Sequence, residues 1–191
     1  MERQKRGAVN LLIALRKFGD PDLPVQLQLR ELMVLVLSAN VRIAPDYQWD
    51  VVAPKVRATL LDVFGFQKRA LGQPALLSEV ISAIQKIEGV QYVDVDAFGG
   101  VPEKKPEADD NGKPTGGRTL LTLDEIAATV QQIVNPRQNS LATRFSRRAE
   151  SVPAARVDVN LADFEAGALR PAQLAIFTEA VPDTLILNQI P

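Results

Sequence analysis

The sequence has neither cysteine nor histidine. Disulfides, thiolate nucleophiles, Ser–His and Cys–His pairs, imidazole acid–base chemistry and the usual Cys/His zinc sites are therefore excluded. Any reaction would have to use carboxylates, lysine, tyrosine, serine or an oxygen-bound metal. Because this set is narrow, we expect a protein that is not an enzyme, with no catalytic residue, no cofactor and no metal site.

The chain also lacks an excess of charge and a long apolar run. Lys and Arg number 22 against 23 Asp and Glu, so the net charge is −1 and gives no overall attraction to nucleic acid. The longest apolar run, Leu32–Leu37, is far shorter than the roughly 20 residues of a membrane helix. The basic start is followed by an apolar run that Arg16 and Lys17 interrupt, which does not favour a signal peptide. We expect neither nucleic-acid binding nor direct membrane insertion.

What the chain does have is enough apolar sequence for a core, 46% of 191 residues, and one well-marked stretch, Leu77–Phe98. Ser78 can cap a helix whose apolar face carries Leu77, Val80, Ile81, Ile84 and Ile87. Gly89 suits the left-handed end of that helix. Beyond it the period becomes two, with Val93, Val95 and Ala97 on one face and Tyr92, Asp94 and Asp96 on the other. So short a link predicts a helix packed on the sheet that holds its own strand.

Four elements are predicted upstream. Ala8–Phe18 has the apolar spacing of a core-facing helix, and the alternation of Val25, Leu27 and Leu29 predicts a half-buried strand. The run Leu32–Ile43 predicts a central strand, covered on both faces in its first half and on one face in its second. A helix capped by Asp46 should follow. Pro54 either lies in its first turn or kinks it, and we favour the kink.

The second half of the chain begins with a stretch rich in Gly, Pro and charge, residues 99–118, which predicts a flexible loop. Thr122 and Glu125 have capping-box spacing before an amphipathic helix that ends at Asn135. Val157, Val159 and Leu161 alternate as in a strand, and two apolar segments follow, Leu174–Phe177 and Thr184–Ile190. We predict an α+β fold in which helices lie on a small mixed sheet as a two-layer sandwich. We expect the chain to consist of three parts: a domain over 1–98, the loop over 99–118, and a C-terminal region over 119–191 whose helix and strands serve in docking.

Several side chains admit two interpretations. Asp94 and Asp96 could share a hydrated cation, although a polar sheet face explains them more simply. The run from Asp109 to Gly112 has a faint likeness to a calcium loop but is better explained as a plain turn. Tyr47 and Trp49 are either anchors for a partner or a cover over the core edge. The arginines at 144, 147 and 148 would form a stripe on a helix, which favours a solvated or protein-binding surface over nucleic acid.

Taken together, four stretches resemble a known family: LLIALRKFGDPDLPVQLQ, RELMVLVLSANVRIAPDYQWDVVAPKVRATLLDVFGF, RALGQPALLSEVISAIQKIEGVQYVDVDAFGGV and RPAQLAIFTEAVPDTLILNQIP. They are similar to the C-terminal part of the baseplate assembly protein family, which resembles the J-like baseplate proteins of contractile phage tails and extracellular contractile injection systems. Because family members are several times longer, the chain is expected to be a C-terminal fragment or a shortened protein.

The resemblance implies a structural role, as a baseplate wedge protein that contacts other subunits around the hub and couples to sheath contraction. Implied partners are other wedge subunits, a second J-like copy or paralogue, and the hub, spike and sheath-proximal proteins. The chain would be assembled in the cytoplasm of the producing cell and form part of a phage tail, tailocin or injection particle. The family brings no catalytic residues with it.

The residues that we expect at subunit contacts are Tyr47, Trp49, Arg144, Arg147, Leu185, Leu187 and Ile190. Deleting Ala180–Pro191 is expected to abolish assembly and leave the domain folded. Two other hypotheses stay open on sequence alone: a small α+β enzyme or regulatory domain that uses carboxylates and a divalent cation, and a nucleic-acid binder that uses Arg144–Arg148.

Overall fold

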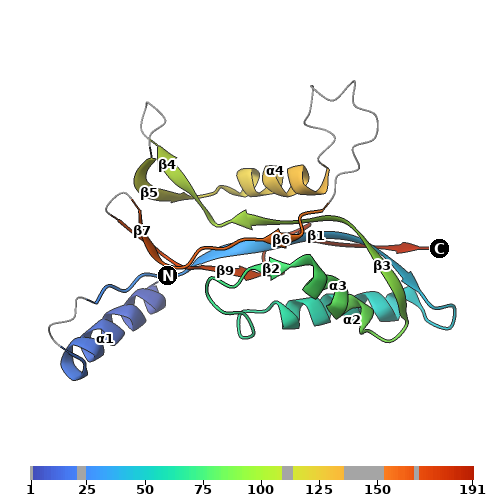
Figure 1. Ribbon diagram of the computed structural model, residues 1–191, viewed down its shortest axis with the longest axis horizontal. Helices are drawn as coiled ribbons and strands as arrows, with labels where there is room; N and C mark the ends of the chain where they lie inside the picture. The colour runs from blue at the N-terminus through green and yellow to red at the C-terminus, as the bar shows by residue number, and fades with distance from the viewer. Residues whose placement is uncertain (1, 21–24, 109–113, 136–152, 166–167) are drawn as a thin grey trace. The chain divides into compact units, whose positions relative to one another are not determined.

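The computed structural model describes residues 2–20, 25–108, 114–135, 153–165 and 168–191 (Figure 1). The chain divides into two units, an N-terminal unit that ends at Arg30 and a main unit, Glu31–Pro191. The first boundary predicted from the sequence lies at residue 98. No helix in the described part of the chain is long and apolar enough to cross a membrane.

The N-terminal unit contains helix α1, Glu2–Phe18, as its only described element. The helix was predicted, and its Val9 and Ile13 are 55% and 59% exposed. The strand expected over Val25–Arg30 is wrong. Those residues have no regular structure, and Leu27 and Leu29 are exposed. Alternation alone does not make a strand when no neighbouring strand supplies hydrogen bonds.

The main unit is built around β1, Glu31–Ile43, the central strand of a four-stranded mixed sheet (Figure 1). One edge of β1 pairs antiparallel with β3, Val90–Pro102. The other edge pairs in parallel with β9, Gln173–Ile176, and then with β10, Leu185–Ile190. The predicted α+β class, mixed sheet and central strand are therefore confirmed.

Helices α2, Trp49–Val63, and α3, Leu77–Gln85, cover one face of this sheet (Figure 1). Between them and the sheet lies the larger apolar cluster, which includes Leu35, Leu37, Val52, Val56, Leu60, Phe64, Val80 and Ile84. Pro54 lies inside α2, six residues into it, so the alternative of a helix beginning near Ala53 is wrong. The residue before the helix is Gln48, not Asp46, and it makes no side-chain cap.

The link from α3 to β3 follows the prediction except at its start. Leu76 precedes the helix, and its backbone N–H donates to Glu79 Oε2 at 3.3 Å. The side chain that accepts a hydrogen bond from the backbone at the start of the helix is therefore that of Glu79, not that of Ser78. Gly89 has φ +94°, the left-handed conformation expected of it. A Cβ on Gly89 would lie 2.5 Å from the Tyr47 ring, so both backbone and space require glycine here.

We expect Gly89→Ala to lower the free energy of unfolding by about 2 kcal/mol, since an L-residue is strained at this φ and its methyl group meets the Tyr47 ring. Urea unfolding followed by circular dichroism measures the change. Gly7→Ala is the matched control. A Cβ at Gly7 meets no atom within 4 Å, and the substitution replaces a glycine inside α1, so it should not lower the free energy of unfolding. Equal effects of the two substitutions would contradict this account.

A bulge in β3 changes which of its side chains enter the core. Ser38 pairs with Ala97 and Ala39 pairs with Val95, so Asp96 has no partner in β1. Phe98 therefore comes opposite Leu37 and joins the larger cluster with Val95, whereas Ala97 does not. The expectation that Val93, Val95 and Ala97 share one face is wrong for Ala97, because one extra residue reverses the alternation beyond it.

The opposite face of the sheet carries α4, Leu123–Val134, above the first half of β1 (Figure 1). Val36, Val101 and Val130 form a second, smaller cluster there. The predicted capping box is confirmed: Thr122 N–H donates to Glu125 Oε2 at 2.8 Å, and Glu125 N–H donates to Thr122 Oγ1 at 3.3 Å. As predicted, the second half of β1 is covered on one face only, and Arg42 is exposed.

The flexible loop expected over 99–118 is wrong for the described residues. Strand β3 continues to Pro102, and Lys104–Ala108 (β4) pairs with Pro114–Leu120 (β5) in a hairpin. Short pairs also form between β2, Ala75–Leu76, and β6, Arg156–Val157, and between β7, Asp163–Glu165, and β8, Ala168–Arg170. The strand predicted through Leu161 thus ends at Val157.

Glu125, at the start of α4, makes the stability of the folded protein depend on pH in the acidic range. Hydrogen bonds from Lys105 and from the backbone of Thr122 lower the pKa of Glu125 from 4.5 to about 2. Its ionised form therefore contributes stability above pH 4.5, which is lost as the pH falls towards about 2. We expect Glu125→Gln to lose less stability than wild type between pH 5 and 2 in urea unfolding. Asp124→Asn, the same charge change one residue away, is the control; equal pH slopes in wild type and Glu125→Gln would contradict the assignment.

Candidate docking surface

Strand β10 forms an edge of the sheet and leaves half of its backbone groups facing away from β1. Leu37 N–H donates to Thr184 O at 2.8 Å, and Leu37 pairs with Leu185. Because backbone direction alternates along a strand, the even-numbered residues 184–190 bond to β1. The N–H and C=O groups of Leu185, Leu187 and Gln189 therefore point outward. In the described part of the chain, β10 pairs with β1 alone.

This outer edge has few of the features that natural edge strands use against unwanted pairing. Thr184–Ile190 contains no charged residue and no proline, and its pairing with β1 has no bulge. The opposite edge strand, β3, has a bulge at Asp96 and exposed carboxylates at Asp94 and Asp96. Charges and bulges discourage edge-to-edge pairing, so β10 is the edge that is open to another strand.

One outward carbonyl of β10 already has a partner in this chain. Arg57, on α2, donates from Nη2 to Leu185 O at 3.0 Å. Arg57 and Leu185 also line a hollow of about 370 Å³ with Ile186 and the turn before β10. The outward carbonyl of Leu185 is thus occupied from within the chain, whereas Leu187 is the first residue of β10 that offers both its outward N–H and its outward C=O.

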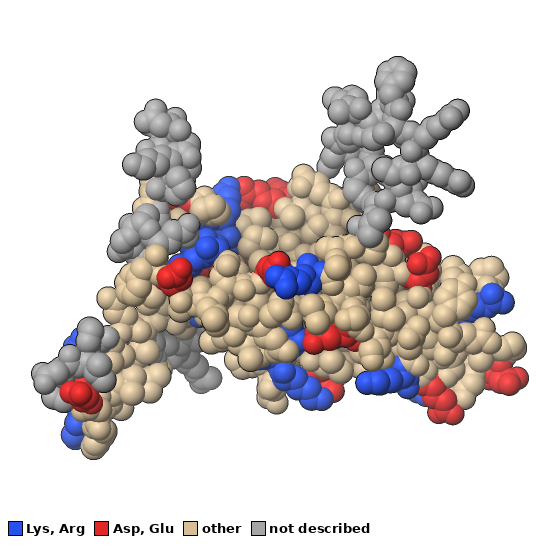
Figure 2. Space-filling view, in the orientation of Figure 1, with Lys and Arg blue, Asp and Glu red and all other residues tan. Residues whose placement is uncertain are grey.

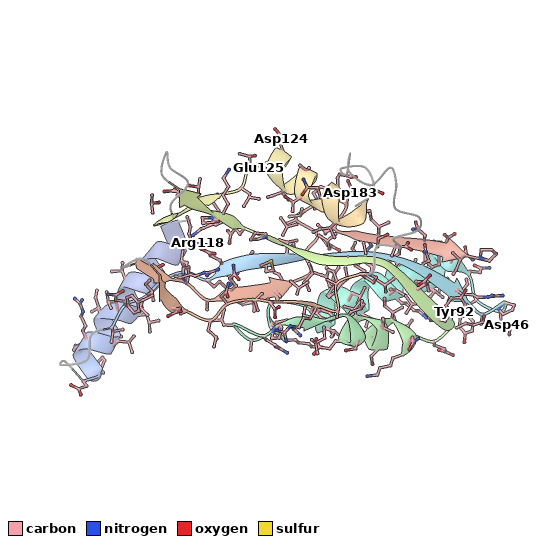
Figure 3. All side chains as sticks on the ribbon, turned by 45° about the horizontal axis from the view of Figure 1, so that its top comes forward. Asp46, Tyr92, Arg118, Asp124, Glu125 and Asp183 are labelled. Atoms are coloured by element: carbon pink, nitrogen blue, oxygen red, sulfur yellow. The ribbon has the colours of Figure 1, made fainter. Side chains whose placement is uncertain are left out.

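On the exposed sheet face, a row of polar side chains crosses three strands. Asn188 Nδ2 donates to Asn40 Oδ1 at 3.3 Å, and Asn40 Nδ2 donates to Asp96 Oδ2 at 2.7 Å. Arg42 lies next along β1, 6.0 Å from the centre of the Tyr92 ring. Figure 3 shows Tyr92 and Asp46 at the same end of the main unit, away from Arg118. Asp96 therefore serves this row of hydrogen bonds, which supports the polar-face interpretation of Asp94 and Asp96.

The predicted contact residues Tyr47 and Ile190 come together at that same end. Both line a hollow of about 320 Å³ with Arg42, Gln91 and Gln189. Tyr47 Oη donates to Glu88 Oε1 at 2.8 Å; this hydrogen bond, followed by desolvation and the charges of Glu88 and Asp46, raises the pKa of Tyr47 above 10.0. Tyr47 is therefore fixed by two hydrogen bonds: one from its side chain to Glu88, which follows α3, and one from its backbone N–H to Ala44 O in the preceding turn.

The remaining predicted contact residues have three different outcomes. Trp49 begins α2 and, like Tyr47, is half-buried against the larger cluster, as the core-cover interpretation expects. Leu185 is buried and Leu187 half-buried in that cluster, so both face this chain's own core. Arg144 and Arg147, with the stripe at 144–148, lie outside the described residues, as do residues 109–112.

These positions also change the expected result of the C-terminal deletion. Removal of Ala180–Pro191 would take away β10, which pairs with six residues of β1 and contributes Leu185 to the core. The deletion would therefore damage the fold together with any docking, contrary to our expectation that the domain stays folded. Single substitutions at outward positions of β10 separate the two effects.

Elsewhere in the main unit, the buried charge of Arg69 has a structural role. Arg69, in the hollow of about 600 Å³ between α2 and α3, donates to Glu79 and to the carbonyls of Gln73 and Pro74, and its guanidinium lies 5.2 Å from the Phe64 ring centre. No group of three or more Asp or Glu that could hold a metal ion occurs in the described part of the chain. Charged side chains of both signs are interspersed among uncharged residues on the face that Figure 2 shows.

Comparison of the chain with protein-family models, with curated proteins and with solved structures gives no match.

Sequence reasoning missed the residues that shape this edge. Arg57 lies 128 positions from Leu185, and Asn188 lies 148 positions from Asn40, so no local pattern connects them. The apolar character of Thr184–Ile190 was the local signal that marked the segment. It indicated docking, and the structure shows that the segment docks first onto β1 of its own chain.

Proposed function

We propose that the chain is a structural wedge subunit in the baseplate of a contractile tail or contractile injection system. The observation that carries the proposal is the combination of the four stretches that resemble baseplate assembly proteins with an open, uncharged edge strand in the last of them. The resemblance supplies the kind of particle. The edge supplies a surface through which a subunit can join a neighbour.

Two further features support a role in assembly over a role in catalysis. The chain has no cysteine or histidine, and the carboxylates that sequence analysis considered, Asp94 and Asp96, lie exposed beside Asn40 on a sheet face. The N-terminal unit contains a helix with charged ends whose apolar residues Val9, Leu11, Ile13 and Phe18 are more than half exposed. Exposed apolar surface of this kind is typical of proteins that are covered by partners.

The test is reconstitution from purified components. The chain is mixed with purified wedge, hub and sheath-proximal proteins of a contractile tail or contractile injection system. We expect it to co-elute with the wedge components in a complex of defined stoichiometry on size-exclusion chromatography. Elution of the chain by itself in every combination would reject the proposal.

A further inference from the structure

We propose that β10 pairs antiparallel with β10 of a second copy of this chain about a two-fold axis at Asn188, joining two four-stranded sheets into one. The inference deepens the proposed function, since it rests on the chain being a docking subunit and names the partner of one edge. It is carried by how well the β10 edge complements itself.

The backbone groups match under one register. Leu187 and Gln189 both point their N–H and C=O groups away from β1, as the bond from Leu37 N–H to Thr184 O requires. If Leu187 of one copy lies opposite Gln189 of the other, the two residues exchange both backbone hydrogen bonds. The two-fold axis repeats the exchange, so four bonds form and every outward group of the two residues is satisfied.

The end of the edge fits the same register. Leu185 would lie opposite Pro191 of the second copy, and proline has no N–H to donate. Leu185 O does not need that donor, because Arg57 of its own chain already donates to it at 3.0 Å. The one hydrogen bond that the second copy cannot supply is therefore made within the first.

The side chains are compatible as well. Asn188 would face Asn188 of the second copy at a non-hydrogen-bonded position, where side chains approach most closely. The polar row Asp96–Asn40–Asn188 would continue across the axis into its symmetry mate. On the same face Ile186 would meet Ile190 of the second copy, and the strand has no charge to repel its own copy.

The edge of β3 does not offer such a match. Self-pairing there would bring the exposed carboxylates of Asp94 and Asp96 towards their own copies, and the bulge at Asp96 interrupts the strand. A second copy is therefore favoured at β10, and the assembly closes as a dimer because both β10 edges are used.

Sedimentation of the chain over a range of concentrations tests the dimer. We expect the mass to rise from 20.9 kDa towards twice that value. Gln189→Pro removes an outward N–H, hence two of the four bonds, and leaves the bonds to β1 intact; it should shift the transition to at least tenfold higher concentration. Gln189→Ala keeps the N–H and should sediment as wild type. A monomer at all concentrations, or equal behaviour of the two variants, would overturn the proposal.

A cysteine cross-link tests the register, with a clean background because the chain has no cysteine. Asn188→Cys places two thiols opposite each other on the axis and should give a covalent dimer under mild oxidation. Ser78→Cys, exposed on α3, should remain monomeric. No cross-link at position 188, or equal cross-linking at both positions, would reject the register. A monomeric chain that still enters the wedge complex rejects the dimer alone, and a dimer that joins no complex rejects the proposed function alone.

Discussion

Replacing Phe64 with alanine is expected to lower the free energy of unfolding by about 4 kcal/mol, because truncating a buried phenylalanine costs about 3–5 kcal/mol. Phe64 is fully buried at the end of α2. Its ring packs edge to face on Phe177 with centroids 5.4 Å apart, and the Arg69 guanidinium lies 5.2 Å from its centre. The alanine variant loses the transfer free energy of the ring and leaves a cavity between α2 and the segment that follows β9.

Differential scanning calorimetry or urea unfolding measures this change. In a chain of this size each kcal/mol corresponds to a shift of about 2–4 °C in Tm. Phe164→Ala is the matched control: the ring of Phe164 is 65% exposed, so its loss should cost less than about 1 kcal/mol. Similar losses at the two positions would mean that Phe64 does not occupy the core position described here.

The second large effect is expected at Arg118. Glu31 begins β1 with no exposed surface, and Arg118 of the β4–β5 hairpin donates from Nε to Glu31 Oε1 at 2.7 Å. Lys104 Nζ lies 3.8 Å from the same Glu31 Oε1, and Oε2 has no hydrogen-bond partner among the described residues. Figure 3 shows Arg118 where the hairpin meets the start of β1.

Arg118→Met is expected to lower the free energy of unfolding by about 3–5 kcal/mol, since it leaves a buried carboxylate without its main partner. Glu31→Met with Arg118→Met should recover at least half of that loss, because a neutral pair carries no desolvation cost. Lys68→Met, which breaks the exposed pair with Asp62, is the control and should cost less than about 1 kcal/mol. If the double variant is less stable than Arg118→Met, the pair is not what makes Arg118 necessary.

The elements that sequence reasoning predicted well are those whose partners lie close in the chain. Helix α4 follows from Thr122 and Glu125, three residues apart, and the turn after α3 follows from Gly89. Strand β1 was predicted because its apolar run is too long and continuous for any exposed strand. In each case the pattern and the structure share the same local physical cause.

The errors arise where distant partners decide the outcome. Residues 104–108 and 114–120 have few apolar side chains, yet they form a hairpin, because a strand pair on the surface needs backbone partners more than apolar ones. Val25–Arg30 shows the reverse, with a good alternation and no strand paired with it among the residues that the structure describes. Glu31 and Arg118 are 87 positions apart, so no spacing rule could have joined them.

The candidate docking surface was only partly predicted, because it too depends on partners that are distant in the chain. Thr184–Ile190 stood out because it is apolar, and Tyr47 and Ile190 do line one hollow. That Leu185 and Leu187 face this chain's core, and that Asn188 lies beside Asn40 on the opposite face of the sheet, depends on the register with β1. A shift of one residue would exchange the two faces of β10, and the six pairs from Leu37 with Leu185 to Arg42 with Ile190 fix the register.

The most direct measurement of the central claim is electron microscopy of the particles that the producing cell makes, with the chain identified by a tag on an exposed position such as Ser78. The account predicts the tag in a ring around the hub at the base of a contractile tail, in every intact particle. Particles that contain sheath, hub and baseplate but never the tagged chain would contradict it.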